Sequence, residues 1–300
     1  MDLGGTTQLW LLFSLLSAFF HASRLAVTKH LSLNLSVPVL TLYVNLASLL
    51  VTLPLALWHH QVPWQDPVYL SAVLAGGLLS GLGGFALTTA IARSEVSLVG
   101  PVMTLTPGFA VLIEWLLTAA LPGPLGLAGL ALLLLGSYVI SIDSSETTWL
   151  RPLRRLFSDP GGRYTLLAAL SFAAAATFGR IGIQRSDPLS FAVVVALVNP
   201  LLLFLLFSLR DPHFYRALHP AALRGQGRAL LLLGLLFALM RIADQLALSL
   251  TLASYAMAVK RSAGMFAVVL GRFWFHEGNT QTKLAGSAIM LLGLFVLLQQ

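Results

Sequence analysis

The sequence predicts an all-α integral membrane protein with ten transmembrane helices in two inverted five-helix repeats. Three observations support this prediction. The 300-residue chain is 57% hydrophobic and only 10% charged, whereas soluble domains are about 25% charged. Apolar runs of about 20 residues, the length that crosses roughly 30 Å of hydrocarbon, occupy most of the chain. The second half of the chain also repeats a residue pattern of the first half.

The apolar runs are separated by short connections that contain Pro or Gly, which end helices. Two connections are longer and polar, at residues 143–163 and 210–228. No stretch remains that is long enough for a sizeable soluble domain. The ten predicted spans are residues 8–27, 37–58, 68–92, 98–120, 125–142, 164–184, 189–209, 229–250, 254–275 and 282–298.

The repeat becomes visible when the chain is shifted by 157 residues against itself. Three pairs of small residues then coincide, and two cations near the end of the first span recur near the end of the sixth with the same spacing of five. We therefore predict a first repeat at 1–143, a polar linker at 144–163 and a second repeat at 164–300. Five is an odd number, so the second copy enters the membrane from the opposite side, as in many transporters. The matched pairs are Gly129 with Gly286, Gly136 with Gly293 and Ser97 with Ser254, and the recurring cations are Arg24 and Lys29 with Arg180 and Arg185.

The net charge of +7 comes from cations at span ends and in connections. Odd-numbered connections carry twelve Lys and Arg, whereas the even ones and both tails carry only Arg185. The positive-inside rule then places the odd connections in the cytoplasm and both termini outside. The cations form no aromatic-interleaved basic stripe, so nucleic acid is not an expected partner.

Signatures of enzymes and cofactors are missing from the sequence. The chain has no Cys, which excludes disulfides, thiol nucleophiles and Cys-ligated metals. It contains no Gly-x-Ser-x-Gly, no HExxH and no phosphate loop. We therefore expect neither an enzyme nor a bound cofactor or metal.

Lys260 and Arg261 are the leading candidates for substrate binding, because two adjacent cations lie inside the ninth predicted span. Each buried charge costs about 2.5–3.5 kcal/mol on the insertion scale. The pair predicts an anion site in which Arg offers a planar fork and Lys a movable point charge. A structural ion pair, or snorkelling of Lys260 toward a nearby interface, is the alternative.

Three further charges lie in predicted spans. Arg241 and Asp244 are three residues apart and so neighbours on one helix face. They either neutralise each other, or Asp244 couples a proton or binds a substrate amine. Glu114 has no charged neighbour within four positions, so it is a candidate for coupling or cation binding. Alternatively, it lies at headgroup level beside Trp115.

Uncharged polar groups suited to line a cavity are Tyr255, Asn45 and Asn199. Hydrogen bonding between helices explains them nearly as well. Arg24 and Arg180 are candidate gate cations, but we expect them to anchor span ends instead.

The last two predicted spans carry a family resemblance. Residues 255–266 (YAMAVKRSAGMF), Gly271, residues 275–277 (FHE) and residues 284–286 (LAG) resemble the C-terminal half of EamA-type carriers of the drug/metabolite transporter superfamily. The first copy departs from the family, with Ala120-Leu121 where its members have Gly-Glu. The Lys260-Arg261 pair is also similar to one that binds phosphate in the sugar-phosphate translocators of that superfamily.

The resemblance implies ten helices around a central cavity and transport of a small polar or amphipathic metabolite. Family members usually have cytoplasmic termini, opposite to the charge count. We interpret the protein as a secondary active transporter of a small anionic or zwitterionic metabolite that works by alternating access. The alternatives are an exporter of neutral amino acids or amphipathic cations, and a non-transporting scaffold or receptor.

The expected partners are the lipid bilayer and a small-molecule substrate, with a proton or a counter-substrate as coupling species. The expected location is the bacterial inner (cytoplasmic) membrane, and monomer and homodimer both stay open.

Overall fold

The computed structural model describes residues 3–57, 62–93, 99, 102–141, 159–218, 225–262 and 280–299. Every regular element within these residues is helical. Six helices are long and apolar enough to cross a membrane, and three more apolar helices are shorter. The all-helical prediction is confirmed, and six of the ten predicted spans correspond to these six long helices.

Except for the fourth and ninth predicted spans, the helices begin and end within about six residues of the predicted spans. In chain order they are α1 (Leu3–Leu31), α2 (Val37–Thr52), the 3-10 turn η1 (Leu53–Leu57), α3 (Pro67–Arg93), α5 (Thr106–Thr118), α6 (Pro124–Ser141), α8 (Pro160–Arg185), α9 (Pro188–Arg210), α10 (Phe214–Ala217), α11 (Gly227–Leu250), α12 (Ala253–Lys260) and α14 (Thr280–Leu297).

Helix starts are set by the residue types that the sequence places there. Asp187 precedes α9, and its carboxylate accepts hydrogen bonds from the backbone N–H groups of Leu189 and Ser190. Asp159 caps α8 in the same way through Gly162 N–H. Proline occupies the first turn of both helices, where its missing N–H is no loss. These caps satisfy donors that the bilayer interior cannot.

The outer faces of the helices are covered with large apolar side chains. Leu116, Leu201 and Phe295 are each more than 60% exposed. Such a surface would be unusual on a soluble monomer. On a multi-pass membrane protein it meets lipid tails, and the polar residues turn inward.

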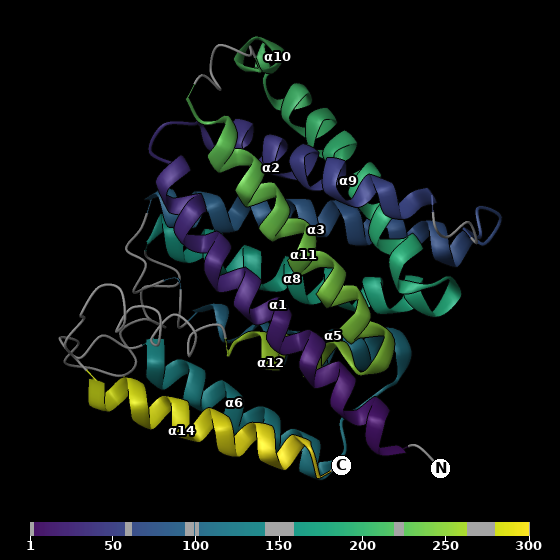
Figure 1. Ribbon diagram of the computed structural model, residues 1–300, viewed down its shortest axis with the longest axis vertical. Coiled ribbons are helices and arrows are strands. Elements are labelled where there is room, and N and C mark those ends of the chain that lie inside the picture. Colours follow the sequence, from purple (N-terminus) through teal and green to yellow (C-terminus); the bar gives the residue numbers. More distant parts are fainter. Residues whose placement is uncertain are drawn as a thin grey trace.

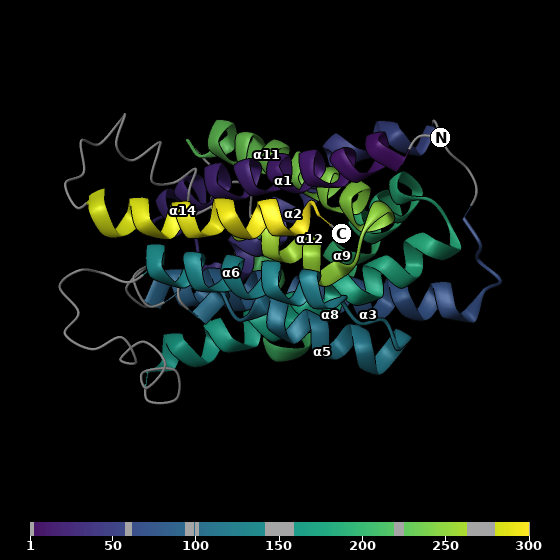
Figure 2. The same ribbon diagram turned by 90° about the horizontal axis from the view of Figure 1, so that it is seen from below.

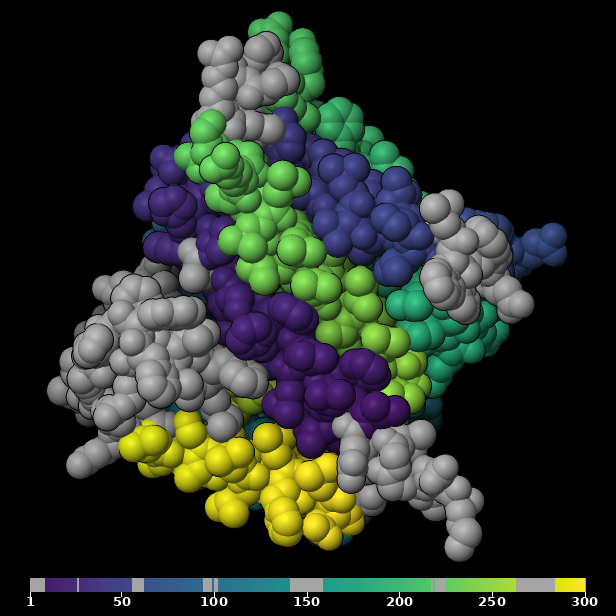
Figure 3. Space-filling model, in the orientation of Figure 1, coloured from purple at the N-terminus to yellow at the C-terminus, as the bar shows by residue number. Residues whose placement is uncertain are grey.

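The helices pack in pairs that are related to each other by exchange of the two predicted five-helix copies. α1 packs along α11, and α3 packs along α8. The first and third spans of one copy therefore contact the third and first spans of the other. The fifth spans, α6 and α14, pack on each other and lie together at one edge of the molecule (Figures 1 and 2). This arrangement fits a duplicated unit with inverted copies. On the face shown in Figure 3, the side chains of α1 and α11 lie side by side, and α14 runs along the lower edge.

Glycines bring α6 and α14 into direct backbone contact. A methyl group added at Gly136 would lie 2.6 Å from the carbonyl oxygen of Gly286, and one at Gly129 would lie 3.1 Å from that of Gly293. The close approach is possible only without side chains at these positions. These are the four glycines that the repeat alignment matched. In the structure Gly136 faces Gly286 and Gly129 faces Gly293, and we call this contact between α6 and α14 the seam.

The seam predicts a large effect of a small substitution. Gly136→Ala is expected to destabilise the protein by at least about 1–3 kcal/mol, because its new methyl group meets backbone atoms that cannot move aside. Gly108→Ala in α5 is the matched control, since a methyl group there has nothing within 4 Å. Thermal unfolding of the purified variants in detergent measures the difference. Equal melting temperatures for the two variants would contradict the seam.

The fourth and ninth predicted spans differ from the prediction, because neither is a single uninterrupted helix. The fourth turns at Thr104 and Leu105 before α5 begins at Thr106, since Pro107 lacks the N–H that a continuous helix needs. In the ninth, α12 ends at Lys260 and the chain turns at Arg261 and Ser262. The rest of that span, with Gly271 and residues 275–277, lies outside the described residues.

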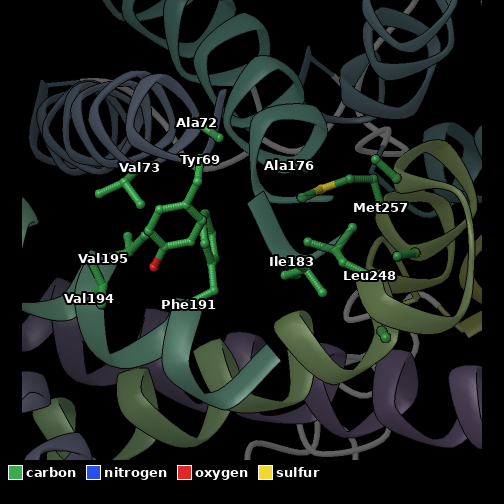
Figure 4. Packing of buried hydrophobic residues seen from close by; sticks show 13 residues of the cluster. Tyr69, Ala72, Val73, Ala176, Ile183, Phe191, Val194, Val195, Leu248 and Met257 are labelled. Carbon is green, nitrogen blue, oxygen red and sulfur yellow. The ribbon is translucent and has the colours of Figure 1, made fainter. Parts of the chain in front are cut away.

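An apolar cluster joins the ends of five helices and forms one end of the interior. Tyr69 from α3 packs edge-on against Phe191 from α9, with 6.1 Å between the ring centroids (Figure 4). Ile183 of α8, Leu248 of α11 and Met257 of α12 complete it from the other side. This apolar cluster lies at the α1 N-terminal side of the cavity described next.

Candidate functional site

A cavity of about 110 Å³ lies at the centre of the helix bundle, with room for several water molecules. Among the described elements, seven helices line it, namely α1, α2, α3, α8, α9, α11 and α12. Phe191, Leu248 and Met257 of the apolar cluster form part of its wall. Its polar and charged lining residues are His21, Arg24, Thr28, Thr41, Asn45, Ser80, Thr88, Arg241, Asp244, Gln245, Lys260 and Arg261.

Positive charge predominates in this cavity. Among its described residues, four cations face a single carboxylate, that of Asp244. The guanidinium carbons of Arg24 and Arg241 lie 4.8 and 5.3 Å from the centroid of the Phe237 ring, so one aromatic ring supports both. An aromatic face partly compensates a cation but offers it no hydrogen-bond acceptor.

Two guanidinium groups retain unused donors. Within the described part of the chain, Arg241 Nη1 and Arg261 Nε are buried without a hydrogen-bond partner. Buried donors are normally satisfied, and those that are not call for an explanation. A planar fork with free N–H groups at a cavity wall is suited to receive a carboxylate or a phosphate.

Lys260 and Asp244 form the ion pair of the cavity. Lys260 Nζ donates to Asp244 Oδ2 at 2.5 Å, and Ser17 Oγ of α1 donates to Asp244 Oδ1 at 2.5 Å. Of the two interpretations left open for Arg241 and Asp244, mutual neutralisation is contradicted, because the ion-pair partner of Asp244 is Lys260. The lysine at the end of α12 reaches the carboxylate directly, and Arg241 is turned toward Phe237 instead.

The expectation that Arg24 anchors a span end is also wrong. Arg24 is 9% exposed and lines the cavity, where its Nε donates to Nδ1 of His21 at 3.4 Å. The sequence held a signal for this. His21 and Arg24 are three residues apart on one helix face, and Arg24 lies seven residues, or about 10 Å, before the end of α1. Ser17, the second partner of Asp244, carried no such signal.

Glu114 lies outside the cavity lining and is paired. Its side chain is 1% exposed, accepts hydrogen bonds from the backbone N–H groups of Ala253 and Ser254 at 2.8 and 3.2 Å, and lies 3.3 Å from Arg180. The hydroxyl of Ser254 also donates to it at 3.0 Å. A carboxylate at a helix N-terminus satisfies donors and complements the helix dipole. Glu114 thus caps α12, and as a paired group it is not a lone coupling carboxylate.

Arg24 and Arg180 occupy equivalent positions in the predicted repeats but have different environments. Arg180 is neutralised by Glu114. The residues that correspond to Glu114 in the second copy, Leu270 or Gly271 for shifts of 156 or 157, are uncharged. Arg180 is therefore paired with an acid, whereas its counterpart Arg24 lines the cavity beside His21 and Phe237.

The remaining predicted site residues divide between the cavity and the helix packing. Asn45 lines the cavity; its Nδ2 donates to Thr41 O, and its buried Oδ1 has no partner among the described residues. Tyr255 packs against Trp10 with ring centroids 6.4 Å apart and does not line the cavity. Asn199 is buried against Gly81, outside the cavity lining.

The other two cations that recur in the repeat, Lys29 and Arg185, contact groups at helix ends. Lys29 donates to the carbonyl of Ile91 near the C-terminal end of α3, where a cation is favourable. Arg185 pairs with Asp66 at 3.1 Å before α3 begins. Desolvation acts to raise the pKa of Asp66, but the hydrogen bonds from Val68, Tyr69 and Arg185 together outweigh it and hold the pKa below its ordinary value. This exposed pair is independent of the cavity.

Comparison with protein families accounts for the shared architecture. The model of the EamA-like transporter family matches two segments, residues 8–142 and 160–299. The chain belongs to the EamA-like transporter family. The two matches fit the duplicated arrangement of the EamA fold, and they identify the protein as a multi-pass membrane transporter of small molecules in the drug/metabolite transporter superfamily.

The fold of the chain is shared by a solved structure over nearly its whole length. One structure, titled "Crystal structure of protein", aligns with a TM-score of 0.68 over 97% of this chain and 95% of its own, at 16% sequence identity. Identity at this level establishes the fold alone. No curated protein matches the chain in sequence.

Proposed function

We propose that this EamA-like transporter is a secondary active carrier that moves a small anionic metabolite by alternating access. The observation that carries the proposal is the charge of the central cavity, where Arg24, Arg241 and Arg261 exceed what one Asp can neutralise. An intramembrane charge is costly and marks a substrate path. A substrate with a phosphate or carboxylate group supplies the missing negative charge, and Lys260 with Arg261 would bind it.

The helix arrangement supports alternating access. Discontinuous helices at bilayer depth are characteristic of transporter binding sites. The fourth span turns at Thr104 and Leu105, and α12 ends at the cavity with Lys260. The apolar cluster around Tyr69 and Phe191 closes one end of the cavity. In the proposed cycle the two five-helix copies exchange conformations. The apolar cluster then opens, and the opposite end of the cavity closes.

Export of amphipathic cations is less compatible with the site. That function needs a carboxylate that is free to bind a cation. Asp244 is engaged by Lys260, and Glu114 lies outside the cavity lining, bonded to Arg180 and to α12. Orientation with both termini outside, and location in the bacterial inner membrane, stay predictions from the sequence.

Substrate charge is the property that tests the proposal. We expect a hexose phosphate or a dicarboxylate to raise the melting temperature of the purified protein, because a ligand that binds only the folded form stabilises it. A neutral amino acid and tetraphenylphosphonium serve as controls of other charge classes and should have no effect. Uptake into proteoliposomes should show the same preference. Stabilisation by tetraphenylphosphonium alone would contradict the proposal.

A further inference from the structure

Asp244 is the one acid among the described residues that line the cavity, and it is held by two short contacts. Lys260 Nζ and Ser17 Oγ each donate to a different carboxylate oxygen. The Asp244 side chain is 19% exposed, compared with 1% for Glu114. Asp244 is therefore accessible from the cavity, as a group must be if it is to exchange partners during a transport cycle.

The surroundings of Asp244 are cationic on every side that contributes a charge. Arg24 comes from α1, Arg241 from the same helix as Asp244, α11, and Lys260 with Arg261 from the end of α12. In the described parts of α2, α3, α8 and α9, no charged residue lines the cavity. A carboxylate in this position contacts Lys260 in the way that the carboxylate or phosphate of a substrate would.

Lys260 is suited to exchange one anion for another. An ammonium group is a compact charge on a flexible stem with three rotatable donors, whereas a guanidinium fork binds in a fixed plane. Lys260 is also the last residue of α12, next to the turn at Arg261 and Ser262. A small rotation of this side chain can transfer it from Asp244 to a second anion in the same cavity.

We propose that Asp244 is an internal counter-ion that competes with the substrate's anionic group for Lys260. In the empty carrier Asp244 occupies the ammonium group. On binding, the substrate's phosphate or carboxylate takes its place, while Ser17 keeps a hydrogen bond to the displaced Asp244. On release, Asp244 returns and displaces the substrate. This inference rests on the proposed transport of anions and adds a residue that limits affinity so that substrate can leave.

A double-mutant cycle isolates this competition. Asp244→Asn removes the charge but keeps the shape and the contact with Ser17, so anion binding should tighten about tenfold, the value of one charge-assisted hydrogen bond. Lys260→Met removes the ammonium group for which Asp244 and the substrate compete. In the Lys260→Met background, Asp244→Asn should therefore leave the Kd of the anion unchanged. The probe is the hexose phosphate or dicarboxylate that most stabilises the wild-type protein, with Kd from calorimetry and KM and turnover from proteoliposomes.

Asp66→Asn is the matched control, because it removes the acid of an ion pair outside the cavity. It should leave Kd unchanged. Turnover of Asp244→Asn should fall as its KM falls, since substrate release is slowed. A purely structural role for Asp244 would lower the melting temperature without tightening Kd. Asp244→Ser makes the same charge change in a smaller side chain and replaces Asp244→Asn if the latter fails to fold.

The outcomes separate this inference from the function on which it rests. Weaker anion binding by Asp244→Asn would overturn the competition and assign Asp244 to a substrate amine. Unchanged binding would also overturn it, as would equal tightening with and without Lys260. Anion binding absent from the wild type and from every variant would overturn the proposed function itself.

Discussion

Replacing Arg241 with glutamine is expected to lower kcat/KM for an anionic substrate at least tenfold without lowering thermal stability. Arg241 is 4% exposed, and its Nη1 has no partner within the described residues. A charge-assisted hydrogen bond to substrate contributes about 1.5–3 kcal/mol, which corresponds to roughly a 10- to 150-fold change. The loss should therefore appear in transport.

The stability of the same variant should stay equal or rise. Contact with Phe237 contributes about 0.5–2 kcal/mol, whereas desolvating an unpaired charge costs several kcal/mol. Removing the charge therefore removes a desolvation cost that is larger than the stabilisation lost with the Phe237 contact. Proteoliposome uptake and thermal unfolding measure the two effects separately. Arg185→Gln, at an exposed ion pair, should change neither. Wild-type transport by Arg241→Gln, or loss of both properties together, would argue against an anion site.

Lys260 is a less direct test of the same site. Its removal deletes a candidate substrate contact and also leaves Asp244 without its ion-pair partner. A loss of transport in such a variant has two explanations. Arg241 avoids this ambiguity because its guanidinium has no carboxylate partner among the described residues.

Replacing Glu114 with glutamine should have the opposite signature, with a large loss of stability. Glu114 holds Arg180 and the first N–H groups of α12 in a buried position. Breaking a buried ion pair on one side costs about 3–5 kcal/mol, because the remaining charge is left uncompensated. The melting temperature should fall by on the order of 10 °C.

The paired arginine gives an internal control. In the double variant Glu114→Gln with Arg180→Gln, the uncompensated charge is gone, so part of the lost stability should return. Asp66→Asn, which breaks the exposed pair with Arg185, should change the melting temperature little, because solvent screens the pair. Thermal unfolding in detergent measures all three. A Glu114→Gln protein as stable as the wild type would show that Glu114 does not hold α12.

Much of the fold is predictable from this sequence because a bilayer imposes simple rules. Apolar length determines where spans lie, and α3, α8, α9 and α11 begin and end within a few residues of the prediction. The glycine pairs Gly129–Gly286 and Gly136–Gly293 were visible as a repeat and proved to form a contact seam. The turns at Thr104–Leu105 and at Arg261–Ser262 were missed, because hydropathy reports the length of an apolar run and not where a helix ends within it.

The site was predicted in its chemistry but only partly in its pairing. Lys260, Arg261, Arg241, Asp244 and Asn45 do line one cavity. Sequence spacing describes neighbours on one helix, so it suggested Arg241 for Asp244, and it gave Glu114 no neighbour at all. The actual partners, Lys260 and Arg180, lie on other helices. Tyr255 was misplaced for the same reason, since its face of α12 meets α1.

The bond from Glu114 to the start of α12 also bears on how such a duplicated chain can evolve. A freshly duplicated unit can in principle revert to two separate identical subunits. Here an acid encoded in the first half finishes a helix encoded in the second and neutralises an arginine of that half. Either half expressed alone would lack the partner of this contact, so each half depends on the other for a charge and a helix cap.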